Sequence, residues 1–294
     1  MRTLISAALL LALAAPAFAA TPINESRPLS PTGRVEIDNV KGRIQVRGWQ
    51  REEVKIEGSL GQGVEKLQIE GDRERLTVKV RYPKGGSNRS EPTDLLLTVP
   101  LKADLDIDSV SANVDVQGVA PASLSIDSVS GDVFVAAAPR EFEADSVSGD
   151  LHVTVNSPDV SIESVSGNIT LRGRLNGEVS TETVSGDIDI AVNGERVRKL
   201  TATTVSGDAG IRAALADNGK IKLETVSGGL RLTLPKDLSA HVTAETFSGD
   251  LRAPGAQINR PKYGPGASLD TRYGSGDGEI SIETFSGDAE LRLE

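Results

Sequence analysis

The sequence has no cysteine among its 294 residues, so disulfide bonds and thiolate chemistry are excluded. It has two histidines, His152 and His241, which lie far apart, so neither a histidine-based metal site nor a Ser-His hydrolase is expected. Aromatic residues make up only 3% of the chain, and Trp49 is its single tryptophan. Lysine and arginine number 32 against 42 aspartate and glutamate, and the resulting charge of -10 argues against nucleic acid as a partner.

Long hydrophobic runs are also missing, except at the N-terminus. Residues 1–19 run from Arg2 through the apolar stretch 4–15 to the small-residue site 17–19, which is the layout of a secretory signal peptide. No other segment approaches the roughly 18 continuous apolar residues of a membrane-spanning helix, so no stable membrane insertion of the mature chain is expected. The sequence predicts cleavage after residue 19, a linker over 20–33, and a periplasmic or secreted protein.

What the sequence does have is a repeat. A ten-residue unit of the form I-E-T-V-S-G-D-I-x-I recurs along the chain, and its shared glycine returns every 18 to 21 residues until a last interval of 38. The copies begin at residues 107, 126, 144, 162, 181, 202, 223, 244 and 282, with a degenerate copy over 37–46.

Apolar residues alternate within each copy, which is the period of a β-strand. One strand, a corner and a second strand make one coil of a solenoid, and stacked coils bury a continuous apolar column. The sequence therefore predicts an all-β parallel solenoid of about ten coils of 18–21 residues. The residues two and four after each glycine should face inward, namely Val133, Val135, Leu151, Val153, Ile169, Leu171, Ile188 and Ile190. A turn or bulge near Ser128 and Val129 is expected to keep Val129 inside with them.

The regions on either side of the repeats differ from them. Residues 34–100 contain strand-like runs separated by charged or Gly-rich turns, and they are expected to form an N-terminal β cap. The solenoid proper is expected over 101–294, with a Pro/Gly-rich loop insertion at 254–278 that could cover the C-terminal end.

The serial SVSGD and TVSGD copies, with the lead-in IDNVKGRIQVRGW at 37–49, resemble a known family. They are similar to the putative adhesin family of secreted bacterial β-solenoid proteins, a domain of unknown function, over residues 33–294. The resemblance implies a solenoid fold and a place at the cell envelope.

Stacking should turn two acidic positions into outer columns. One lies directly after the glycine, as in Asp150 and Asp187, and the other lies four residues before it, as in Asp127 and Glu163. One interpretation is that the carboxylate oxygens of such columns bind divalent cations. Turn chemistry is the favoured reading, with Asp and Ser side chains bonding nearby backbone N–H groups. No metal or other cofactor is expected, and the glycine itself indicates either a positive φ angle or a position too tight for a Cβ atom.

Identical residues in every coil do not supply the unique environment that a nucleophile needs, so the sequence predicts no enzyme. The predicted function is a cell-envelope scaffold or adhesin-like interaction protein whose partner is an envelope protein or a glycan. The alternative is a glycan-binding or glycan-cleaving β-helix protein acting through the 254–278 loop. The candidate interaction residues of that loop are Arg260, Lys262, Tyr263, Arg272 and Tyr273. The same loop can also be read as a cap packed on the last coil, with Phe247 and Phe285 stacked beneath it.

Overall fold

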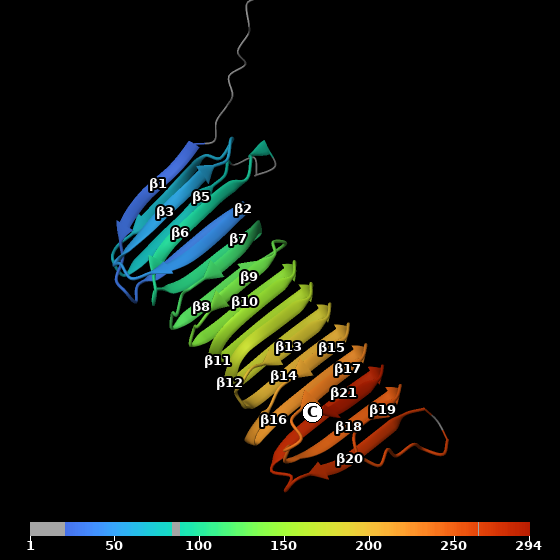
Figure 1. Cartoon of the computed structure of the whole chain (residues 1–294). Helices are drawn as coiled ribbons and strands as arrows, with labels where there is room; N and C mark the ends of the chain where they lie inside the picture. The colour runs from blue at the N-terminus through green and yellow to red at the C-terminus, as the bar shows by residue number, and fades with distance from the viewer. Residues whose placement is uncertain (1–20, 84–88, 264) are drawn as a thin grey trace, which may run out of the picture.

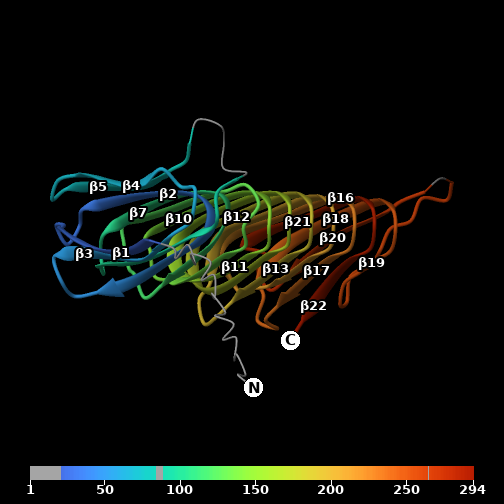
Figure 2. The ribbon, with the colours of Figure 1, turned by 90° about the horizontal axis from the view of Figure 1, so that it is seen from above.

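The computed structural model describes residues 21–83, 89–263 and 265–294, so the expected signal peptide at 1–19 lies outside the described residues. The described chain is all β, and its strands stack side by side into an elongated, solenoid-like body (Figure 1). Seen from above, each coil runs along one face, turns, and returns along the other (Figure 2). We call the segments before the repeat glycine the first face and those after it the second face.

Neighbouring coils pair in parallel on both faces, as the sequence predicted. On the first face the stack runs through β7 (Asp104–Gln117), β8 (Ser123–Ser128), β10 (Glu141–Ser148), β11 (Leu151–Ser166), β12 (Ile169–Ser185), β14 (Val197–Ser206) and β16 (Leu215–Ser227). On the second face it runs through β7, β9 (Val133–Ala137), β11, β12, β13 (Ile188–Val192), β15 (Ala209–Arg212) and β17 (Leu230–Leu234).

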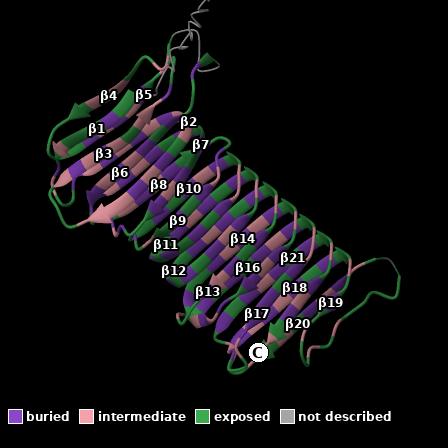
Figure 3. Cartoon of the chain, turned by 45° about the horizontal axis from the view of Figure 1, so that its top comes forward, coloured by how far each residue is buried: buried purple, intermediate pink, exposed green. Residues whose placement is uncertain are grey.

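The interior is the apolar column that the alternation predicted. All eight residues expected to face inward are buried, from Val133 to Ile190, with exposed fractions of 3% or less. Buried and exposed positions alternate along the strands (Figure 3). Burying a Val, Leu or Ile side chain stabilises a fold by roughly 1.5–3 kcal/mol, so this column is the main source of stability.

The corner of the coil corrects one prediction. Ser128, not Val129, is the inward residue, and the Val129 side chain is 46% exposed. The Ser128 hydroxyl accepts a hydrogen bond from the Gly131 N–H (3.3 Å) and donates one to the Gly131 carbonyl (3.2 Å). A hydroxyl can satisfy the backbone groups that the turn leaves unpaired inside the corner, whereas a valine cannot, so the valine faces outward.

The corner glycines pack against one another. A Cβ atom on Gly167 would lie 2.1 Å from the carbonyl oxygen of Gly149 in the preceding coil, and one on Gly149 would lie 2.5 Å from that of Gly131. Gly149 also has a φ angle of 143°, which favours glycine. The expectation of a tight position is therefore confirmed, although the first coil of the repeat places Ala112 opposite Gly42 in this slot.

The C-terminal coils do not stack in chain order, which the repeat alone did not predict. The last coil, β21 (Gly278–Ser286) and β22 (Ala289–Leu293), lies between β16–β17 and the earlier pair β18 (Ala240–Ser248) and β19 (Leu251–Arg252) (Figure 1). The expected loop insertion contains β20 (Ala267–Tyr273), which pairs antiparallel with β18. The pair β18–β19 therefore comes earlier in the sequence than β21–β22 but lies farther from β16–β17 in the stack.

The N-terminal region continues the same stack. β2 (Arg34–Trp49), the degenerate copy, pairs in parallel with β7 along its length. β5 (Arg75–Arg81) and β6 (Thr93–Pro100) pair in parallel with its two halves. The outermost strands are antiparallel: β4 (Lys66–Gly71) on β5, β3 (Glu53–Leu60) on β6, and β1 (Thr21–Pro28) on β3. Residues 21–28 were expected in a linker, and their pairing with β3 shows that this was wrong.

Candidate functional site

Outward-facing apolar residues line the corner of the solenoid from β7 to β21. We call them the valine column: Val110, Val129, Val147, Val165, Val184, Val205, Val226, Phe247 and Phe285. Each side chain is about half exposed, between 45% and 57%. The two phenylalanines stack with their ring centroids 4.9 Å apart and their planes 6° from parallel. Large contiguous apolar patches are rare on soluble proteins and typically mark an interaction surface.

A row of carboxylates runs beside the valine column, because residues two apart in a strand share a face. This acidic column consists of Asp108, Asp127, Asp145, Glu163, Glu182, Glu224, Glu245 and Glu283, with Thr203 as an interruption. The two columns line a groove in two parts. The part from Asp108 to Val205 encloses about 730 Å³, and the part toward Phe247, Phe285 and Pro261 encloses about 740 Å³.

The carboxylates of the acidic column lie close together. Asp108, Asp127, Asp145, Glu163 and Glu182 are direct neighbours in consecutive parallel strands. Among the described residues, none of these five carboxylates forms an ion pair. Burial, followed by the negative charge of neighbouring carboxylates, raises the pKa of Asp108, Asp127 and Asp145 above its ordinary value. The column therefore carries an electrostatic cost that the chain offsets only in places, through Lys79 near Asp108 and through Lys222, which pairs with Glu224 (2.8 Å).

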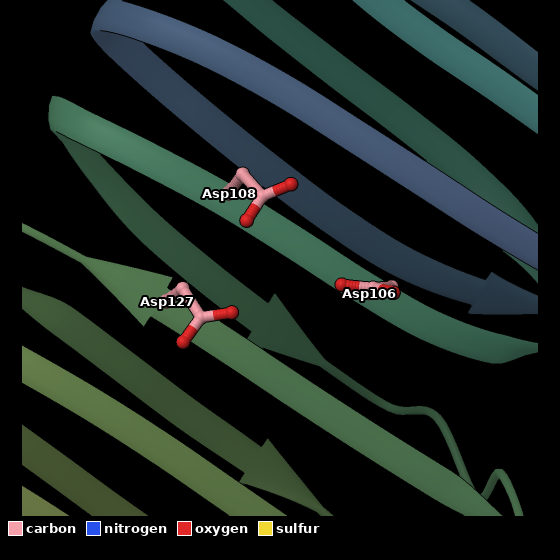
Figure 4. A group of neighbouring side chains, drawn as sticks. All are labelled: Asp106, Asp108 and Asp127. Atoms are coloured by element: carbon pink, nitrogen blue, oxygen red, sulfur yellow. The ribbon is translucent and has the colours of Figure 1, made fainter.

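Asp108 and Asp127, the first two members of this column, form an acidic group with Asp106. Oxygens of Asp106, Asp108 and Asp127 all lie within 4.8 Å of one another, on two adjacent strands (Figure 4). Asp106 is already paired with Arg34, whose guanidinium is 2.7 Å from its carboxylate. Calcium takes six to eight oxygen ligands, and this group supplies three residues, so its geometry does not by itself define a cation site.

The second acidic column, directly after the glycine, has a different role. In it, Oδ1 of one coil accepts a hydrogen bond from the backbone N–H of the next. The pairs are Asn113 to Asp132 (3.1 Å), Asp132 to Asp150 (3.1 Å), Asp150 to Asn168 (3.0 Å), Asn168 to Asp187 (3.0 Å), Asp187 to Asp208 (2.9 Å) and Asp208 to Gly229 (2.7 Å). The expected bonding of Asp side chains to backbone N–H groups is confirmed for this column, but the N–H groups belong to the next coil and not to the same turn, so the column links the coils.

The five candidate loop residues do not form one cluster. Arg260 pairs with Asp250 (2.7 Å), and the Lys262 ammonium lies 5.5 Å from the ring centroid of Tyr263, which is 84% exposed. Arg272 and Tyr273 belong to β20.

Tyr273 supports the fold at this end. Its hydroxyl donates to the Pro254 carbonyl (2.6 Å), and its ring packs against the core. Pro261, Pro265 and Gly266 of the same loop line the groove near Phe247. The loop therefore contributes Pro261, Pro265 and Gly266 to the groove and one exposed aromatic side chain, Tyr263, to the surface.

The outward valines were missed because an apolar residue was assigned to the core. The signal was present in the parity of the strand. Leu124, Ile126 and Ser128 are two apart and all buried, so strict alternation places Val129 outside.

The parallel coils, the buried column and the glycine corner define a class of repetitive all-β proteins. Within that class the chain belongs to the Toastrack DUF4097 family, whose model matches residues 32–292. No curated protein matches the sequence.

Solved structures share the fold at low identity. A putative adhesin from Parabacteroides distasonis is 13% identical, with a TM-score of 0.56 over 92% of this chain and 97% of its own. A putative lipid binding protein from the same organism is 14% identical, with a TM-score of 0.54 over 92% of this chain and 96% of its own. At this identity the likeness concerns the fold alone.

Among the described residues, no helix has the length and hydrophobicity needed to cross a membrane.

Proposed function

We propose that this chain is a non-enzymatic, adhesin-like interaction protein of the cell envelope, and that the groove between the valine and acidic columns is its binding surface. One observation carries the proposal: nine half-exposed apolar side chains recur at the same place in the coils from β7 to β21. Leaving them in water is unfavourable, so a partner that covers them gains the free energy of apolar burial. Two solved structures with this fold carry names that concern binding, one a putative adhesin and the other a putative lipid binding protein.

The same proposal assigns a role to the rest of the architecture. About ten coils act as a rigid support, and the antiparallel strands β1, β3 and β4 at one end and β20 at the other act as caps. An exposed parallel edge would recruit further strands, and antiparallel end strands interrupt that stacking. Residues 1–19 direct export, which places the mature chain in the periplasm or outside the cell.

Catalysis is not part of the proposal. From Asp108 to Val205 the groove is lined by equivalent residues in successive coils, so this part offers no nucleophile or base in surroundings of its own. The glycan alternative would need the loop residues to converge on one surface. Instead Arg260 pairs with Asp250, Tyr263 contacts Lys262, and Tyr273 bonds the Pro254 carbonyl.

The test is retention at the envelope. The full chain is expressed in its host with Val147→Ser, Val165→Ser and Val184→Ser together, which removes apolar surface from the middle of the groove. The matched control carries Phe134→Ser, Ala136→Ser and Thr154→Ser, three outward positions on the second face. Both sets replace exposed side chains, so circular dichroism should show both variants folded.

We expect the mature chain to start at residue 20, and the groove variant to be lost from the envelope fraction while the control is retained. Equal retention of the two variants would refute the groove as the binding surface. A cytoplasmic wild-type protein with an uncleaved N-terminus would refute the location.

A further inference from the structure

The groove has a definite chemical preference. We propose that its occupant is an extended cationic segment of another polypeptide, in which basic and apolar side chains alternate. This inference rests on the proposed function, because it names the partner of the same groove.

The charge of the partner follows from the acidic column. Asp127, Asp145 and Glu163 lie on adjacent strands and have no ion pair in the described chain. Like charges about 5 Å apart repel by roughly 1 kcal/mol even at the dielectric of water. Lysine or arginine side chains placed along the column would turn this repulsion into attraction, whereas an anionic partner would increase it. Other acids of the coil have partners within the chain. Some form ion pairs, as in Arg47–Asp115 (2.7 Å) and Arg174–Glu195 (2.8 Å), and those directly after the glycine accept backbone N–H groups, as Asp150 does from Asn168 (3.0 Å).

The apolar part of the partner follows from the valine column. A hydrated metal ion or a small amine would satisfy the carboxylates and leave Val147, Val165 and Val184 in water. A partner that also buries these side chains must carry apolar groups beside its charges. The two columns lie side by side, so the partner presents basic groups to one and apolar groups to the other.

The length and regularity of the groove indicate an extended chain. The columns repeat once per coil, at the roughly 4.8 Å spacing of paired strands, whereas side chains on one side of an extended peptide recur about every 6.6 Å. The flexible four-carbon stem of lysine can bridge this mismatch, because its ammonium can reach any of several neighbouring carboxylates. The groove should therefore accept many basic-apolar sequences rather than one exact register.

The chain offers a direct test with synthetic peptides. The purified protein from residue 20 is titrated into a fluorescent peptide of about ten residues, roughly 33 Å when extended, in which lysine and leucine alternate. Matched peptides replace lysine by glutamate or leucine by serine. Vesicles containing anionic phospholipid serve as a second probe, because a lipid surface is the competing occupant.

We expect the lysine-leucine peptide to bind, with a Kd that rises with salt. Neutralising the column with Asp127→Asn, Asp145→Asn and Glu163→Gln should weaken binding about tenfold, which corresponds to three exposed ion pairs of modest strength. The valine-to-serine variant should also bind more weakly, and the glutamate-leucine peptide and the vesicles should not bind. Equal binding of the glutamate-leucine peptide, tight binding of vesicles, or an unchanged Kd for the neutralised variant would overturn the inference.

The two proposals fail in different ways. If the valine-to-serine variant loses envelope retention but no lysine-leucine peptide binds, the cationic partner is wrong and the groove keeps its function. If the peptide binds in the groove but retention does not depend on the valines, the chemistry stands and the proposed function is wrong.

Discussion

The corner glycines give the sharpest prediction about stability, because each one faces backbone and not a movable side chain. A Cβ atom at position 167 would lie 2.1 Å from the Gly149 oxygen and 2.9 Å from the Gly149 carbonyl carbon. Such contacts require the two coils to separate by about 1 Å, which strains the parallel ladders beside the corner. We expect Gly167→Ala to destabilise the protein by about 2–4 kcal/mol, and Gly167→Val by more.

Gly210 provides the matched control. A Cβ atom at this position would meet only the Asp189 carboxylate oxygen, at 3.9 Å, so Gly210→Ala should change stability by no more than about 0.5 kcal/mol. Both variants are compared by thermal and urea unfolding followed by circular dichroism. Hydrogen exchange of the neighbouring amides shows whether the loss is local, since repeat arrays need not unfold in one step. Equal stability of Gly167→Ala and Gly210→Ala would show that the glycine stack is not tight.

Three further predictions concern the side chains beside the corner. Asp150→Ala should destabilise the fold by about 1 kcal/mol, because the Asn168 N–H loses its hydrogen-bond acceptor. Asp150→Asn should be nearly neutral, because an asparagine, Asn168, already accepts the equivalent bond from the Asp187 N–H. Equal losses of the two variants in urea unfolding would contradict this prediction. Gly229→Asn should stabilise by about 0.5–1.5 kcal/mol, since glycine interrupts the same ladder; a lower melting temperature would count against the ladder. The raised pKa of Asp127 predicts that its charge destabilises the fold at neutral pH and that the cost disappears as the pH falls through that pKa toward the ordinary value of 3.8. Asp127→Asn should therefore be more stable than wild type near pH 7, with a difference that shrinks in acid; a difference that grows in acid would refute the sign.

Much of the fold could be predicted from the sequence because the repeat encodes it directly. The alternation around Val133 and Leu151 fixes which side chains face inward, and the recurrence of glycine marks the corner. The order of the last two coils could not be predicted. The copies ending near Ser248 and Ser286 carry the same motif, so either could stack on β16, and only the pairing of the folded chain distinguishes them.

The site was predicted in part. The acidic columns were expected on the outside, but the motif cannot show that the carboxylate after the glycine bonds backbone while Asp127 and Glu163 do not. The valine column was missed because hydrophobicity was given more weight than parity at Val129. The loop residues were chosen for their composition, and the contacts of Arg260 and Tyr273 depend on a strand, β20, that the Pro/Gly-rich sequence did not indicate.

Site-specific photo-crosslinking in intact cells tests the groove most directly. In one variant a photo-reactive phenylalanine replaces Val165 in the valine column. In a second variant it replaces Thr170, an outward-facing residue on the second face of the same repeat. We predict a covalent adduct of defined mass from position 165, suppressed by excess lysine-leucine peptide, and none from position 170. Adducts of equal yield from both positions, or none from position 165 while the protein is held at the envelope, would contradict the claim that the groove is the binding surface.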